Sequence, residues 1–241
     1  MFRLTAAQRA FYDAFGFLRL AGLFRDEAEQ LSRGFDDVFA QHDPTMVITS
    51  DDDVLQRTER AAGRSYRNII APDFVDRSAL LRSLDLPRHP RVVGVVASLV
   101  DRPVEYRASD GHRFHCDTSW HHDAYGTPLD LETIKLSFYL DRLRADSGAI
   151  RVIPGTHDLG SAFATTLRET LYRSPDGVRE LYGVDAEAIP SWTLENEPGD
   201  VLVWNFRTIH ASFRGREGRR SFALTFSTLG GADTASAKPT T

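Results

Sequence analysis

The sequence predicts an α+β fold that is mainly β. Segments with helical periodicity occupy about the first 100 residues, and segments of alternating hydrophobicity follow from about residue 104. Neither an internal repeat nor a linker interrupts the chain. Helices that precede a run of strands favour α+β over alternating α/β units. We therefore expect one domain over residues 1–229, followed by a disordered tail of small and polar residues over 230–241.

The chain opens with a helix, a strand and a second helix. Thr5 can cap the first helix and Gly16 can end it, after which residues 17–20 alternate like a strand. Asp26 can cap the second helix, in which the apolar side chains recur at helical spacing. These apolar residues are Ala28, Leu31, Phe35, Val38 and Phe39.

Two more helices are expected before the strands begin. Residues 41–66 are polar and have no clear period, so we interpret them as a long loop. Residues 78–84 have helical spacing. Residues 90–100 form the next helix, because Pro90 suits a first helical turn.

The second half of the chain is dominated by strands. The clearest alternation is that of TIKLSFYL at residues 133–140. An insertion over residues 158–190, with a helix near residues 167–172, is expected to form a lid or substrate loop. The other expected strands are 104–107, 149–153, 201–204 and 221–227.

Composition excludes several classes of function. The chain is 41% hydrophobic and 10% aromatic, which is enough to fill a core, and its net charge of −5 gives no basic footprint for nucleic acid. Cys116 is the single cysteine, which excludes an internal disulfide and fits a reducing compartment. The start of the chain is amphipathic and predicts neither a signal peptide nor a membrane span. We expect a cytoplasmic protein.

Three residues suggest a metal site. His121 and Asp123 lie one residue apart, and His210 follows a short apolar run far downstream. Two imidazoles and one carboxylate leave coordination positions open, which suits non-haem Fe(II) and oxygen chemistry.

A second pair, His115 and Asp117, competes with the first. Ligands one residue apart in an extended strand point to the same side, so either pair could chelate a metal. Chemistry alone does not choose between them. The shorter link from Asp123 to the strand at residues 133–140 favours the later pair.

Three stretches carry a family resemblance: LTAAQRAFYDAFGFLRLAGLF at the start, SGAIRVIPGTH, and GDVLVWNFRTIH around His210. Over most of residues 4–227 the chain resembles the phytanoyl-CoA dioxygenase family of Fe(II)- and 2-oxoglutarate-dependent oxygenases. SDGHRFHCDTSWHHD resembles a bacterial variant in which only the later pair, preceded by Trp, binds the metal. The resemblance implies a double-stranded β-helix, a jelly-roll or cupin-like barrel, with helices packed on one side.

The resemblance also implies the ligands and the cosubstrate. His121, Asp123 and His210 would hold Fe(II), and 2-oxoglutarate would bind this metal through its keto-acid end before O2 binds. An arginine on the last core strand would receive the distal carboxylate of 2-oxoglutarate. Arg219 and Arg220 both stand at this position.

Strand parity separates the two arginines. Arg219 shares a face with Ser221, whereas Phe222 and its apolar neighbours lie on the opposite face and should pack against the helices. A guanidinium beside a serine hydroxyl makes a good carboxylate site. Ser212 matches a position where relatives offer a hydroxyl to the same carboxylate. We expect Arg219, Ser212 and Ser221 to bind 2-oxoglutarate.

The expected reaction follows from Asp123. Related halogenases have a small residue at this position, so a carboxylate predicts hydroxylation, desaturation or ring closure. The residues near the ligand pair are mostly polar, which suits a small polar metabolite such as a sugar or aminocyclitol in specialised, natural-product metabolism. Two alternatives remain: a barrel that binds metal or ligand without turnover, and hydrolysis at a zinc centre.

Overall fold

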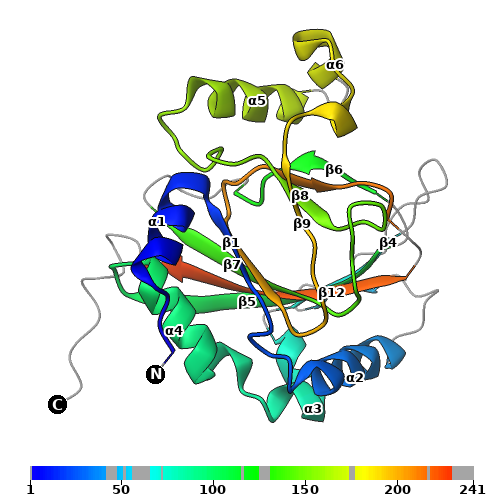
Figure 1. Cartoon of the computed structure of the whole chain (residues 1–241). Coiled ribbons are helices and arrows are strands. Elements are labelled where there is room, and N and C mark those ends of the chain that lie inside the picture. The colour runs from blue at the N-terminus through cyan, green and yellow to red at the C-terminus, as the bar shows by residue number, and fades with distance from the viewer. Residues whose placement is uncertain are drawn as a thin grey trace.

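Two antiparallel sheets face each other, with helices outside both (Figure 1). The computed structural model describes residues 2–41, 48–50, 53–55, 66–71, 73–114, 117–124, 131–173, 177–215 and 218–229. Within these residues the large sheet has the order β1-β10-β7-β12-β5-β4-β3-β2 and the small sheet the order β6-β11-β8-β9. This arrangement is the double-stranded β-helix that the family resemblance implies.

The large sheet is built from β1 (Phe17–Leu20), β2 (Ile48–Ser50), β3 (Asp53–Leu55), β4 (Tyr66–Ala71), β5 (Val104–Phe114), β7 (Thr133–Tyr139), β10 (Val201–Asn205) and β12 (Arg219–Thr228). The small sheet is built from β6 (Thr118–His121), β8 (Ile150–Val152), β9 (Trp192–Leu194) and β11 (His210–Ser212). The α-helices are α1 (Ala6–Phe15), α2 (Ala28–Ala40), α3 (Ala79–Arg82), α4 (Pro90–Leu99), α5 (Ala162–Arg173) and α6 (Gly177–Tyr182).

Three apolar clusters hold these layers together. The largest joins α2, α3 and α4 to the outer face of the large sheet, with Phe35, Leu81 and Phe222 fully buried in it. A second cluster lies between the two sheets and includes Trp204. A third joins the outer face of the small sheet to α5 and α6 around Trp120. Burial of this apolar surface is the main favourable term in folding. The second cluster fills part of the space between the two sheets, and polar side chains lie in the rest of that space.

Local signals place the first helix as expected. Thr5 forms a capping box with Gln8, and Gly16 ends α1 in the left-handed region with φ 80°. The second helix begins one residue later than predicted: Glu27, not Asp26, is the N-cap of α2, and it makes no side-chain cap bond. Packing of the apolar face of α2 therefore decides its start.

The predicted strands at residues 17–20, 133–140, 149–153, 201–204 and 221–227 are confirmed within two residues at their ends. The strand predicted at 104–107 is also confirmed, but β5 continues to Phe114, well past the predicted end. The loop expected over residues 41–66 is wrong in part, because β2 and β3 lie within it. Their strand structure comes from backbone pairing at the edge of the large sheet, which needs no alternating side-chain pattern. The predicted tail at 230–241 lies outside the described residues, and the single domain over 1–229 stays a prediction.

The insertion at residues 158–190 forms α5 and α6, which cover the small sheet in Figure 1. The predicted helix near residues 167–172 is confirmed and is longer than expected. Among the described residues, no helix is both long and apolar enough to cross a membrane.

Candidate active site

Strand pairing brings the two distant histidines together. β6 and β11 are antiparallel neighbours, and their register places His121 opposite His210. Asp123 follows β6, and its backbone N–H donates to the carbonyl of Phe206 at 2.9 Å. One side-chain ligand atom from each of His121, Asp123 and His210 lies within 4.8 Å of the others. These three side chains therefore have the spacing of a metal-binding group.

Backbone carbonyls orient both imidazoles. His121 Nδ1 lies 2.7 Å from the carbonyl oxygen of Ser119, and His210 Nδ1 lies 2.9 Å from that of Thr208. An Nδ1–H donated to a carbonyl leaves Nε2 of a neutral imidazole with its lone pair free. Both rings can thus offer Nε2 to a metal, and such second contacts fix the ring orientation of a metal ligand.

The ionisation states suit metal binding. Burial lowers the pKa of His210 to about 3, so its imidazole is neutral at pH 7. Burial opposes ionisation of Asp123, but the charge of Lys135 and a hydrogen bond from Trp204 outweigh burial and hold the pKa of Asp123 well below its usual range. Imidazole nitrogens from two histidines and one carboxylate are a donor set that fits Fe(II).

A small cavity of about 110 Å³ adjoins this group. It is far smaller than the roughly 300–1,000 Å³ of typical drug-sized pockets, so it suits a compact ligand. Arg219 and Ser221 line it together with the three candidate ligands. Arg219 is only 4% exposed, contacts Ser212 Oγ and the carbonyl oxygen of Gly148, and lies 5.0 Å from the ring centre of Phe114.

The two adjacent arginines point to different surroundings. Arg220 donates to Asp141 at 2.8 Å and to Asp36 at 2.6 Å, and does not line the cavity. The face that carries Arg219 and Ser221 turns toward the cavity, whereas Phe222 packs in the helix-side cluster. The parity of β12 thus separates the arginines in the way that the alternation predicts.

Of the competing pair His115 and Asp117, only Asp117 lies within the described residues. Asp117 Oδ1 accepts a hydrogen bond of 2.9 Å from the backbone N–H of Gly215, and Asp117 does not belong to the metal-binding group found among the described residues. This contact ties the start of β6 to the loop that follows β11.

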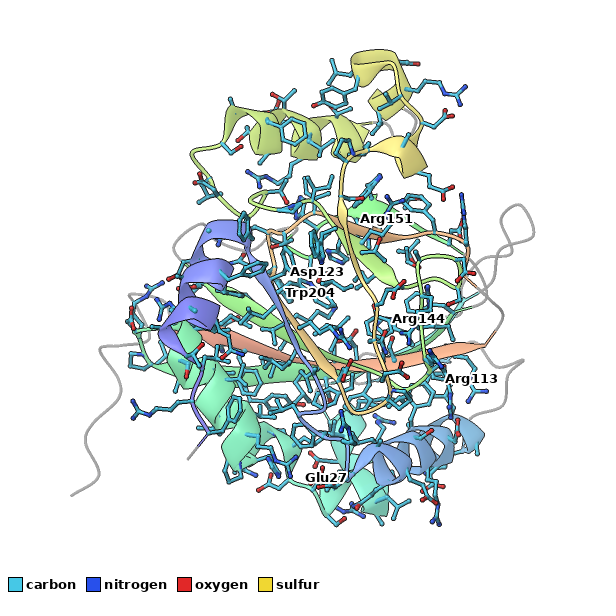
Figure 2. The ribbon with its side chains drawn as sticks, in the orientation of Figure 1. Glu27, Arg113, Asp123, Arg144, Arg151 and Trp204 are labelled. Atoms are coloured by element: carbon cyan, nitrogen blue, oxygen red, sulfur yellow. The ribbon has the colours of Figure 1, made fainter. Side chains whose placement is uncertain are left out.

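Several residues of the site are missed by sequence reasoning. Trp204 packs in the cluster between the sheets and also donates from Nε1 to Asp123 Oδ2 at 3.1 Å, and Figure 2 shows the two side chains beside each other. Lys135 lies 3.5 Å from Asp123 and 3.6 Å from Asp110. One sequence signal existed for Lys135: it stands on the polar face of the strand that also carries Ser137.

Comparisons with known proteins now place the chain. The family model of phytanoyl-CoA dioxygenase (PhyH) matches residues 12–221. The chain belongs to the PhyH family. As a member of this family it is an Fe(II)- and 2-oxoglutarate-dependent oxygenase that uses O2. No curated protein matches the sequence significantly.

Solved structures share the fold over nearly the whole chain. The non-haem α-ketoglutarate-dependent carbocyclase SnoK from nogalamycin biosynthesis has a TM-score of 0.65 at 20% identity, covering 93% of this chain and 84% of its own. AviO1 from Streptomyces viridochromogenes Tue57 has a TM-score of 0.66 at 18% identity, covering 100% and 99%. HygX from Streptomyces hygroscopicus, solved with nickel and 2-oxoglutarate bound, has a TM-score of 0.65 at 19% identity, covering 94% and 88%. At such identities the likeness shows the fold alone.

Proposed function

We propose that the protein oxidises a small polar metabolite by hydroxylation, desaturation or ring closure, in specialised metabolism and in the cytoplasm. His121, Asp123 and His210 hold Fe(II) in this proposal, and Arg219, Ser212 and Ser221 bind the distal carboxylate of 2-oxoglutarate. The observation that carries it is the common cavity of a metal-binding group and a buried arginine. When bound, iron and 2-oxoglutarate would activate O2: decarboxylation of 2-oxoglutarate to succinate and CO2 gives two of the four electrons that O2 takes up, and oxidation of the substrate gives the other two.

The side chains and carbonyls of the protein would hold and orient the metal, the cosubstrate and the substrate. The carbonyls of Ser119 and Thr208 keep the imidazoles in the tautomer that leaves Nε2 free. Arg219 is buried between Ser212 and Phe114, where weak solvation strengthens its attraction for a carboxylate. A dicarboxylate held at Arg219 and at the metal would be fixed at both ends, which leaves the remaining cavity surface to orient the substrate.

Two observations support a polar substrate in natural-product metabolism. Within the described residues the cavity carries His112, Thr118 and Ser137 in addition to the proposed iron and cosubstrate residues. Similar structures include SnoK and the α-ketoglutarate-dependent epimerase SnoN, both from nogalamycin biosynthesis. Sugars and aminocyclitols have the hydroxyl and amino groups that such a surface can hydrogen-bond.

The decisive experiment measures succinate formed from 2-oxoglutarate, with and without candidate sugars, aminocyclitols and an acyl-CoA. His121→Ala, Asp123→Ala and His210→Ala should abolish substrate-coupled succinate formation. Arg219→Ala should raise the 2-oxoglutarate concentration needed for half-maximal rate by about 10- to 100-fold, because a charge-assisted contact of about 1.5–3 kcal/mol is lost. Arg220→Ala is the matched control and should leave that concentration unchanged.

Other outcomes would favour the alternatives. Loss of coupled turnover in His115→Ala, with His121→Ala still active, would move the metal to the earlier pair. Binding of Fe(II) and 2-oxoglutarate without succinate formation on any substrate would indicate a non-catalytic barrel. Hydrolysis with zinc and without O2 would indicate the hydrolytic alternative.

A further inference from the structure

The middle of β7 places an ammonium group inside the barrel. Lys135 pairs with Trp204 of β10 and Thr225 of β12 in the strand register. Its chain neighbours Ile134 and Leu136 are at most 1% exposed and belong to the helix-side cluster. Since successive side chains of a strand point to opposite faces, Lys135 points between the sheets, where it lines the candidate site.

Lys135 lies between two carboxylates. Its Nζ is 3.6 Å from Asp110 Oδ2 and 3.5 Å from Asp123 Oδ2, and the three side chains are 12–16% exposed. Asp110 comes from β5 and is also hydrogen-bonded to His112 Nε2. Burial opposes the charging of Lys135, but the two carboxylates outweigh burial and raise its pKa. An unpaired charge is costly in such surroundings, so the three groups hold one another in place.

Two donors act on one oxygen of Asp123. The indole N–H of Trp204 donates to Oδ2 at 3.1 Å, and the ammonium of Lys135 lies 3.5 Å from the same atom. Together they restrict the rotation of the carboxylate relative to His121 and His210. A lysine suits this position because its compact ammonium can face two carboxylates at once, whereas the planar fork of an arginine would engage one of them bidentately.

We propose that Lys135 and Asp110 form a positioning pair that fixes the carboxylate of Asp123 for metal binding. Lys135 orients this carboxylate, and Asp110 shares the ammonium so that Asp123 keeps its strength as a ligand. The inference rests on the proposed function in one respect: Asp123 must be a metal ligand.

Positioning and simple electrostatics predict opposite effects. An ammonium beside a ligand carboxylate repels a divalent cation, so its removal alone would strengthen metal binding. The double variant Lys135→Met/Asp110→Asn removes one positive and one negative charge together. The net charge near the metal stays the same, and the effect of orientation is isolated.

The test is an anaerobic titration of the apo protein with Co(II), followed by the visible absorption of the bound ion. The double variant should bind Co(II) about 10- to 100-fold more weakly, as is typical when an outer contact of a metal ligand is lost. The shape of the Co(II) absorption should also change, because a free carboxylate can alter the coordination geometry. Arg88→Met/Asp85→Asn is the charge-matched control and should behave like the wild type, since these two side chains are 84% and 55% exposed.

Folding of each variant is checked by circular dichroism. If Lys135→Met/Asp110→Asn does not fold, Lys135→Gln/Asp110→Asn replaces it. This second variant keeps an N–H donor at residue 135, so we expect a smaller loss of Co(II) affinity, of about threefold. An unchanged Co(II) affinity and absorption in the folded variant overturns the proposal. So does a loss confined to 2-oxoglutarate affinity, which would make Lys135 a cosubstrate contact. If the wild type binds Co(II) no better than His210→Ala, the proposed function fails instead.

Discussion

At the scale of single residues, burial keeps one imidazole of the candidate site and one beside it neutral. Burial lowers the pKa of His210 to about 3 and that of His122 to about 4, from an ordinary value of 6.5. His122 lies beside the candidate ligands and its Nδ1 accepts from the backbone N–H of Ala124 at 3.1 Å. Neither side chain can take up a proton in the folded protein until the pH is well below the range in which free histidine does so.

This difference predicts how the stability of the apo protein depends on pH. Between about pH 6.5 and pH 4 the unfolded chain binds more protons than the folded chain, so the unfolding temperature should fall as the pH falls through this range. Above pH 6.5 these two histidines are neutral in both the folded and the unfolded state, so they no longer make the stability depend on pH. Thermal unfolding of the metal-free protein at pH 7.5, 6.0 and 5.0 measures it. His122→Gln should reduce the slope, and a constant or rising midpoint toward pH 5.0 would contradict the assignment.

At the scale of elements, the turn before β8 supports Arg219, the arginine of the proposed 2-oxoglutarate clamp. Gly148 has φ +89°, and its carbonyl oxygen accepts from Ser212 Oγ at 3.0 Å and from Arg219. A Cβ added at Gly148 would overlap the guanidinium of Arg219 and the Cα of Gly215. Glycine is therefore required here both for its backbone conformation and for the close approach of Arg219.

Gly148→Ala should therefore act on the cosubstrate site. We expect the 2-oxoglutarate concentration for half-maximal succinate formation to rise about tenfold, the effect of losing about 1.4 kcal/mol of binding. Gly183→Ala is the control for backbone strain, because Gly183 has φ +67° and no atom within 4 Å of the added Cβ. That variant should lose about 1–2 kcal/mol of stability with no change in the 2-oxoglutarate requirement. If both variants need the same 2-oxoglutarate concentration for half-maximal succinate formation, Gly148 does not act through the proposed clamp.

The elements also show which sequence signals were sufficient. The alternation of β7 and β12 predicts their strands and the inward face of Arg219, because each has a large apolar face on one side. β2 and β3 lack such a signal and depend on edge pairing. His121 and Asp123 are recognised from their spacing, whereas the partners of Asp123 are not. Trp204 and Lys135 lie on other strands, and their approach to Asp123 follows from the order of strands in the large sheet.

At the scale of the whole molecule, an ionic cluster joins the helix layer to the sheet. Asp36 of α2 accepts from Arg220 at 2.6 Å and from Arg113 of β5 at 2.7 Å, and Figure 2 shows Arg113 near the end of α2. Arg220 also pairs with Asp141, which follows β7. Three elements that are distant in sequence therefore meet at one guanidinium.

Arg220→Ala should lower the free energy of unfolding by about 1–2 kcal/mol, since Arg220 is mostly buried while the side chain of Asp36 is 47% exposed and screened by solvent. Denaturant unfolding of the apo protein measures this change. Arg142→Ala is the matched control: its side chain is 68% exposed and pairs with Glu197, so its effect should stay within about 0.5 kcal/mol. If Arg220→Ala is as stable as the control, the cluster does not join the layers energetically.

Three features could be read from the amino-acid sequence alone: the residue types of the candidate metal ligands, the strand parity that turns Arg219 inward, and the resemblance to the PhyH family. These features are local: they depend on the spacing of neighbouring residues and on the period of a strand. Three other features appear only once the chain is folded: His210 lies opposite His121, Asp117 bonds to a loop, and Lys135 lies between Asp110 and Asp123. The physical reason is that contacts between strands follow the pairing of the sheets, and no local pattern specifies which distant strand becomes a neighbour.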